Sequence, residues 1–165
     1  MTDGARRRES TVGLQAQTAA IDVLRGMYKA YQAGDPSGID AVLSADLTMF
    51  DSVHADLIVG LDELNVVRSQ RSADGSGHVE TDVAMVNPRA FGNGDSVLVA
   101  YWLRVDLADR QGRPCAPELS RNTALLRREG GRWKVVHIHE DVWVSLGAAS
   151  VPDQAWEDHP ISPAS

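Results

Sequence analysis

The fold is decided by the stretch from residue 97 to residue 144, which reads VLVAYWLRVDLADRQGRPCAPELSRNTALLRREGGRWKVVHIHEDVWV. Three runs within it, 97–107, 119–128 and 132–144, alternate between apolar and polar positions and are rich in residues that favour strands. Turn sequences that contain glycine separate the three runs. The stretch therefore predicts a meander of antiparallel strands with two faces of different polarity.

The segments that precede this meander predict mainly helices. Apolar residues recur at helical spacing in the first of them, and Gly34 follows it as a helix-ending residue. Helices that come before an antiparallel meander indicate an α+β fold, with N-terminal helices packed on one face of a strongly curved antiparallel sheet. The predicted elements are a helix over 19–31, a short helix opening at Asp35-Pro36, a strand over 47–51, a helix over 61–71 and a strand over 79–91.

Length and composition limit the classes of partner. The 165 residues suit one domain, expected over 14–146, between a flexible segment at 1–13 and a flexible or subunit-docking segment at 147–165. The net charge of −7 argues against nucleic acid, and no apolar run is long enough to cross a membrane. The single cysteine, Cys115, allows no internal disulfide and no cysteine-based metal cage, so we expect a cytoplasmic protein.

Two carboxylates fall on strand faces that are otherwise apolar. Asp51 follows Leu47 and Met49 in alternation, and Glu140 follows Ile138 in the last strand. Burial raises the pKa of a carboxyl group, so both residues are candidates for a catalytic base and acid near neutral pH. Two structural alternatives stay open: Asp51 ends its strand in a turn, and Glu140 lies beyond the covered part of the sheet.

Further residues are expected to line a pocket beside these carboxylates. Inward positions of the neighbouring strands supply Tyr101, Asn122 and Ile138, and the first long helix supplies Tyr31. We expect these side chains to bind a small, mainly hydrophobic molecule. No cofactor is expected, because the glycines of the chain show no phosphate-binding spacing.

The opposite face of the meander carries a different set of side chains, Arg121, His137, His139 and Trp143. Two histidines two positions apart on a strand point the same way, but a metal site needs a third ligand, and no residue offers one at a supporting spacing. We therefore expect no metal. Aromatic, arginine and histidine side chains commonly form subunit interfaces, so we expect these four to build a homodimer or a larger ring.

Several short motifs over roughly residues 16–145 carry a family resemblance. They are Ala33-Gly34-Asp35, Val59-Gly60-Leu61-Asp62, Asn87-Pro88, Ala100-Tyr101, Asp109-Arg110-Gln111-Gly112-Arg113-Pro114 and Arg128-Glu129-Gly130-Gly131-Arg132-Trp133 leading into His137-Ile138-His139. On these motifs the chain resembles the nuclear transport factor 2-like (SnoaL-like) superfamily, and within it the association (hub) domain of calcium/calmodulin-dependent protein kinase II. The resemblance implies a cone-shaped, cystatin-like roll that encloses a pocket. The arginines of the hub cavity would fall on Leu103, Ala124 and Glu140, so the anion-binding pocket of the hub is not expected here.

A looser resemblance points to ketosteroid isomerase. Its catalytic base would fall on Asp51, and its oxyanion-binding tyrosine would fall near Met27, one residue from Tyr28. Its protonated aspartic acid would fall near 123–125, where the chain has no acid. Limonene epoxide hydrolase offers a weaker parallel through Arg104 and Asp106, which the alternation turns outward.

Two functions follow from these observations. The first is a cofactor-free SnoaL-like enzyme that moves a proton in an isomerisation, a cyclisation or an epoxide opening, with Asp51 as base and Glu140 as acid. The second is a module without catalytic activity that binds a ligand or assembles copies of the chain, as the resemblance to the hub domain implies. The fold alone does not decide between the two functions.

Overall fold

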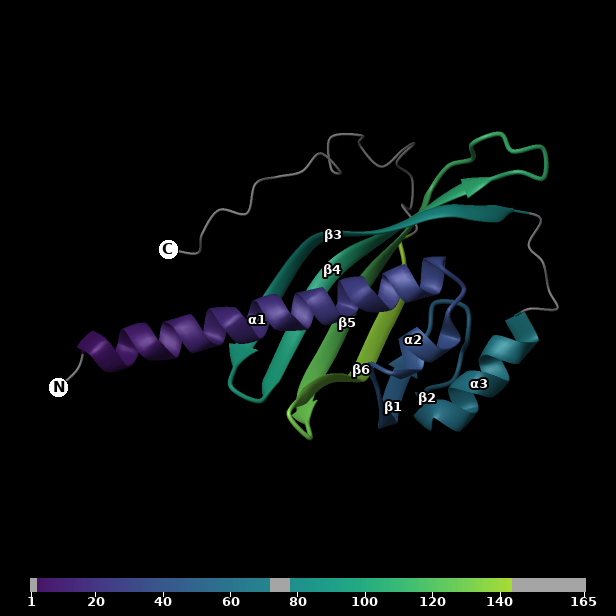
Figure 1. The fold of residues 1–165 in the computed structure, drawn as a ribbon. Helices are drawn as coiled ribbons and strands as arrows, with labels where there is room; N and C mark the ends of the chain where they lie inside the picture. The colour runs from purple at the N-terminus through teal and green to yellow at the C-terminus, as the bar shows by residue number, and fades with distance from the viewer. Residues whose placement is uncertain (1–2, 72–77, 144–165) are drawn as a thin grey trace.

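The structure is a computed structural model that describes residues 3–71 and 78–143 (Figure 1). It holds one mixed sheet in the order β2-β1-β6-β5-β4-β3, with helix α1 lying across one face, and this is the predicted α+β fold. The elements are α1 (Asp3–Gln32), α2 (Pro36–Asp40), β1 (Leu43–Phe50), β2 (Ile58–Val59), α3 (Gly60–Arg71), β3 (Val79–Asn93), β4 (Ser96–Ala108), β5 (Glu118–Glu129) and β6 (Arg132–Val142).

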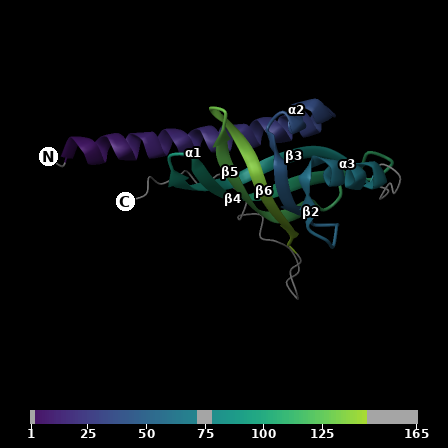
Figure 2. The same ribbon diagram turned by 90° about the horizontal axis from the view of Figure 1, so that it is seen from below.

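Helix α1 packs on the sheet through a stripe of small and apolar side chains. Ala16, Ala20, Leu24 and Met27 follow one another at intervals of three or four residues and are all at most 6% exposed. The helix begins at Asp3, whereas the sequence predicted a loose segment over 1–13. Polar composition argues against burial but not against a helix, because alanine, arginine and glutamate have high helix propensity. The N-terminal end of α1 accordingly runs past the sheet (Figures 1 and 2). The predicted C-terminal segment 147–165 lies outside the described residues.

The sheet differs from the prediction in the pairing of β1. Four strand pairs are antiparallel, but β1 runs parallel to β6, with Thr48 beside His137 and Phe50 beside His139. No tight turn joins these two strands, so nothing in the local sequence imposes an antiparallel arrangement. Strand β1 is also longer than predicted, and the two-residue strand β2 is too short to leave a sequence pattern.

Strand β6 changes its facing direction at a bulge. Leu125 pairs with His137 and Leu126 pairs with Val135, which leaves Val136 as an additional residue on β6. Trp133 and Val135 before the bulge are therefore buried, at 9% and 0% exposed. The sequence predicted one alternation over 132–144 with His137 and His139 on the outer face, which would also turn Trp133 outward, and this was wrong before the bulge. It holds after the bulge, where Ile138 is buried and His139 is exposed.

Substituting two glycines tests the backbone geometry of this fold. Gly92 in β3 has φ +113°, and a Cβ added there would lie 2.6 Å from the backbone oxygen of Ser96. We expect Gly92→Ala to lower the free energy of unfolding by about 1–3 kcal/mol, since both the backbone angle and the contact oppose a side chain. The matched change Gly26→Ala, in the middle of α1 with nothing within 4 Å of the new Cβ, should raise it by about 0.5–1 kcal/mol. Urea unfolding followed by circular dichroism measures both changes, and equal stabilities would contradict the β3–β4 hairpin geometry.

Candidate functional site

Four polar side chains form a row across the helix-facing side of the sheet, here called the inner row. Tyr101 of β4 pairs with Asn122 of β5, and Asn122 pairs with Glu140 of β6. Phe50 lies beside His139, so Asp51, the next residue along, comes beside Glu140. Paired positions in neighbouring strands place Cβ atoms about 4.5–5.5 Å apart. The structure thus brings together the two predicted carboxylates and two of the predicted binding residues.

Helix α1 adds a second tyrosine to the inner row. The hydroxyl groups of Tyr28 and Tyr101 are 2.7 Å apart, and their rings meet edge to face at 6.0 Å. Burial raises the pKa of both phenols, and the negative charge of Glu140 raises it further. The two hydroxyls therefore keep their protons at neutral pH and act as hydrogen-bond donors. Only the resemblance to ketosteroid isomerase pointed near Tyr28, since helical spacing alone does not single out this residue.

The two carboxylates are positioned by the loop that follows β1. Ser52 donates from its hydroxyl to Glu140 Oε1 at 2.8 Å, and the Val53 backbone N–H donates to Asp51 Oδ1 at 2.9 Å. Asp51 is only 8% exposed. The predicted alternative that Asp51 ends its strand in a turn is consistent with this hydrogen bond, and the same turn holds the carboxylate at the end of the inner row.

Asn122 is the most deeply buried polar member of the inner row, at 3% exposed. Its amide nitrogen donates to the hydroxyl of Ser120 at 2.8 Å. Its side-chain oxygen, Oδ1, is buried and has no hydrogen-bond partner. An acceptor left in this state costs about 1–3 kcal/mol, so the site holds an unused hydrogen-bonding position.

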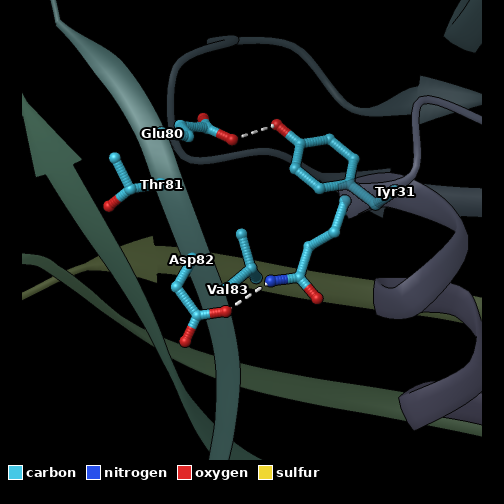
Figure 3. A pocket seen from close by; sticks show the side chains of 6 residues that line it. Tyr31, Glu80, Thr81, Asp82 and Val83 are labelled. Carbon is cyan, nitrogen blue, oxygen red and sulfur yellow. Dashed lines mark hydrogen bonds between the residues drawn. The ribbon is translucent and has the colours of Figure 1, made fainter.

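Two other predicted binding residues lie apart from the inner row. Ile138 is buried two residues before Glu140 and contributes to the apolar core. Tyr31 is 46% exposed and donates to Glu80 at 2.9 Å across a shallow groove of about 240 Å³ between α1 and β3 (Figure 3). The structure therefore does not place Tyr31 with Tyr101, because Tyr28, one turn earlier on α1, faces that residue.

The predicted interface residues gather on the opposite side of the same strands, and we call Arg121, His137, His139 and Trp143 the outer patch. Arg121 forms an ion pair with Asp141 and lies over the ring of Trp143, 5.0 Å from its centroid. That ring in turn meets Trp102 edge to face at 6.0 Å. Aromatic and guanidinium groups are thus stacked together at the surface.

The two histidines of the outer patch lie beside the ring of Phe50. Thr48 and His137 Nδ1 form a hydrogen bond of 2.8 Å that links β1 to β6. Burial, and to a smaller degree the neighbouring His139, lower the pKa of His137, which favours a neutral ring at pH 7. Within residues 3–71 and 78–143, no three His, Cys, Asp or Glu side chains form a group that could hold a metal ion. In the same ranges, no helix is long and apolar enough to span a bilayer.

Known structures share this architecture. An NTF2-like protein from Pseudomonas putida KT2440 superposes with a TM-score of 0.68 at 20% identity, covering 82% of this chain and 92% of that one. The association domain of CaMKII from C. elegans gives a TM-score of 0.64 at 21% identity, covering 78% and 97%. A ketosteroid isomerase-like protein from Erwinia carotovora atroseptica gives 0.62 at 16% identity, covering 78% and 97%. At these identities the likeness establishes the NTF2-like fold and nothing further.

Comparison by sequence tests family membership, which is narrower than likeness of fold. No curated protein matches the chain. The family profile described as the calcium/calmodulin dependent protein kinase II association domain matches residues 16–142. This span covers most of the chain and contains the whole of the inner row, and the chain therefore belongs to the calcium/calmodulin dependent protein kinase II association domain family.

Proposed function

We propose that the inner row is the active site of a small-molecule enzyme of the SnoaL-like kind, which moves a proton on a mainly hydrophobic substrate without a cofactor. The observation that carries this proposal is the register. Three strands and the residue that follows β1 each contribute one polar side chain to the same line, on a face whose other buried side chains, apart from Ser120, are mainly apolar. Polar groups that converge in an apolar setting are typical of binding and catalytic sites.

The proposed roles follow from the contacts of each residue. Asp51, positioned by the N–H of Val53, takes a proton from the substrate. Glu140, beside it, is the group proposed to return a proton to the substrate. An isomerisation then needs only removal of a proton at one atom and its return at another, and an epoxide opening or a cyclisation begins with the same acid and base.

The two tyrosines complete the proposed mechanism. One hydroxyl of the Tyr28–Tyr101 pair donates to the other, and the accepting one keeps its own proton free to donate to a substrate oxygen. Since the pKa of both is raised, they serve as donors and not as bases. Negative charge that develops on that oxygen is stabilised by a donor already in place, the largest single contribution in many enzymes.

Replacing Asp51 by Asn tests the proposed base. We expect Asp51→Asn to slow proton exchange on a hydrophobic ketone about 100- to 10,000-fold, the range that a positioned acid or base contributes, with the fold unchanged. Deuterium uptake at the α-carbons of 2-tetralone in D₂O, followed by NMR, measures the rate. Asp56→Asn, an exposed carboxylate on the same loop, is the matched control and should exchange at the rate of the unsubstituted protein. Equal rates for the two variants would remove Asp51 from the mechanism.

A second function, self-association through the outer patch, has its own supporting observation. The patch lies on the side of β5 and β6 opposite to the inner row, and it combines stacked tryptophan and arginine with two histidines. Side chains of this kind are enriched in protein interfaces. The C. elegans relative is described as an association domain and the family bears the same name, which favours the same behaviour here.

Trp143→Ala tests this second function. Tryptophans at interface centres often contribute 2 kcal/mol or more, so we expect the apparent dissociation constant of the assembly to rise about thirtyfold or more. Light scattering behind size-exclusion chromatography, run over a dilution series, gives the mass. Val66→Ala removes an exposed apolar side chain from α3 and should leave the mass unchanged. Identical mass profiles for the two variants would rule out Trp143 as an interface residue.

A further inference from the structure

The outer patch continues into a band of side chains that crosses the sheet. Directly paired residues share one face of a sheet, and the register gives a line of such pairs from β3 to β1. Phe91 pairs with Leu98, and Leu98 pairs with Leu125. Leu125 pairs with His137, which lies beside Thr48. These five residues form the outer band, in which Phe91 and Leu98 are exposed apolar side chains.

The nearest neighbours of His137 on β1 and β5 carry no charge. The ring of Phe50 meets the rings of His137 and His139, at centroid distances of 6.5 Å and 5.5 Å. Thr48 and His137 Nδ1 form a hydrogen bond of 2.8 Å, and Leu125 lies opposite on β5. Such surroundings suit a neutral imidazole, because burial among apolar groups disfavours the charged form.

The charged side chains on the same side of the sheet do not favour a charge on His137. Those that β1, β5 and β6 place there are Asp46, Arg121, Arg127, Glu129, Arg132, Lys134 and Asp141. The acid Asp141 is paired with Arg121. The other two acids, Asp46 and Glu129, are both paired with Arg127. Each acid therefore already has an arginine partner, and a charged His137 would add to the positive groups of this face.

A second copy packed against the outer band makes a charge on His137 still less favourable. Burial first, and His139 second, already lower the pKa of His137 in the single chain. The second copy would remove more water from the ring and would lower this pKa further. The separated chain then holds more protons than the assembled one, so a fall in pH shifts the equilibrium toward the separated chain.

We propose that His137 and His139 make the self-association of this chain pH-dependent. Two copies pack through the outer patch and outer band while both rings are neutral, and protonation between about pH 7 and pH 5 separates the copies. This inference rests on the second proposed function, because it names the regulation of the same surface. A two-fold assembly uses the same patch on both copies, so the charge arises on both sides of the interface.

The apparent dissociation constant of the assembly, measured against pH, tests the inference. Light scattering behind size-exclusion chromatography, run over a dilution series at about pH 7.5, 6.5 and 5.5, gives the constant, and circular dichroism checks the fold at each pH. One proton taken up per separating chain changes the constant about tenfold per pH unit, so we expect a rise of about tenfold or more over this range. A constant that stays level or falls on acidification would overturn the pH dependence and leave self-association standing. A monomer at every pH would overturn both.

Matched histidine substitutions tie the effect to this surface. His137→Gln keeps a side chain that can form a hydrogen bond with Thr48 but carries no charge, so the constant should change about threefold or less over the same range. His139→Gln should also weaken the pH dependence, because it removes the neighbouring charge. His78→Gln, at an exposed histidine just before β3, is the matched control and should keep the full dependence. Equal pH dependence in all three variants would contradict the proposal.

A reciprocal measurement needs no substitution. If protons separate the copies, then assembly must lower the pKa of His137 through the same linkage. This pKa, followed by NMR through the ring C–H signals, should be lower in a concentrated, assembled sample than in a dilute, separated one. Equal values in the two samples would overturn the proposal, whatever the variants show.

Discussion

The parallel pairing of β1 with β6 is the constraint on which the rest of the structure depends. It joins the N-terminal helices and β1 to the meander, through the hydrogen bond from the Val135 N–H to the Val42 oxygen and through the contact of Thr48 with His137. The same register decides that Asp51 comes beside Glu140. A shift of β1 by one residue would turn Asp51 to the outer face, because side chains alternate along a strand.

Alternation also explains how one small sheet can serve two purposes. Successive residues of β6 point to opposite sides, so Ile138 and Glu140 face α1 while His137 and His139 face away from it. The inner row and the outer patch therefore share strands without sharing side chains. A change on one face can leave the other intact, so the two proposed functions can be tested separately.

The sequence predicted the parts of this structure that depend on local periodicity. Alternation along the strands placed Asp51, Asn122 and Glu140 on the inner face, and helical spacing identified α1 and α3. Three features depend on contacts distant in sequence and were missed. They are the parallel direction of β1, the bulge at Val136, and the choice of Tyr28 over Tyr31 on α1. The two tyrosines are three residues apart, about 60° around a helix, so the apolar stripe alone does not tell which one meets the sheet.

The inner row carries a free-energy cost, because it places carboxylate and amide groups inside the core, where apolar side chains of similar size would be more stable. Ala124, two residues from Asn122 on the same strand face, is fully buried, so an apolar side chain is well accommodated there. Asn122 nevertheless leaves a buried oxygen without a partner, at a cost of about 1–3 kcal/mol. Proteins commonly break the rule of satisfied polar groups at functional sites, and a ligand that donates to this oxygen would recover the loss on binding.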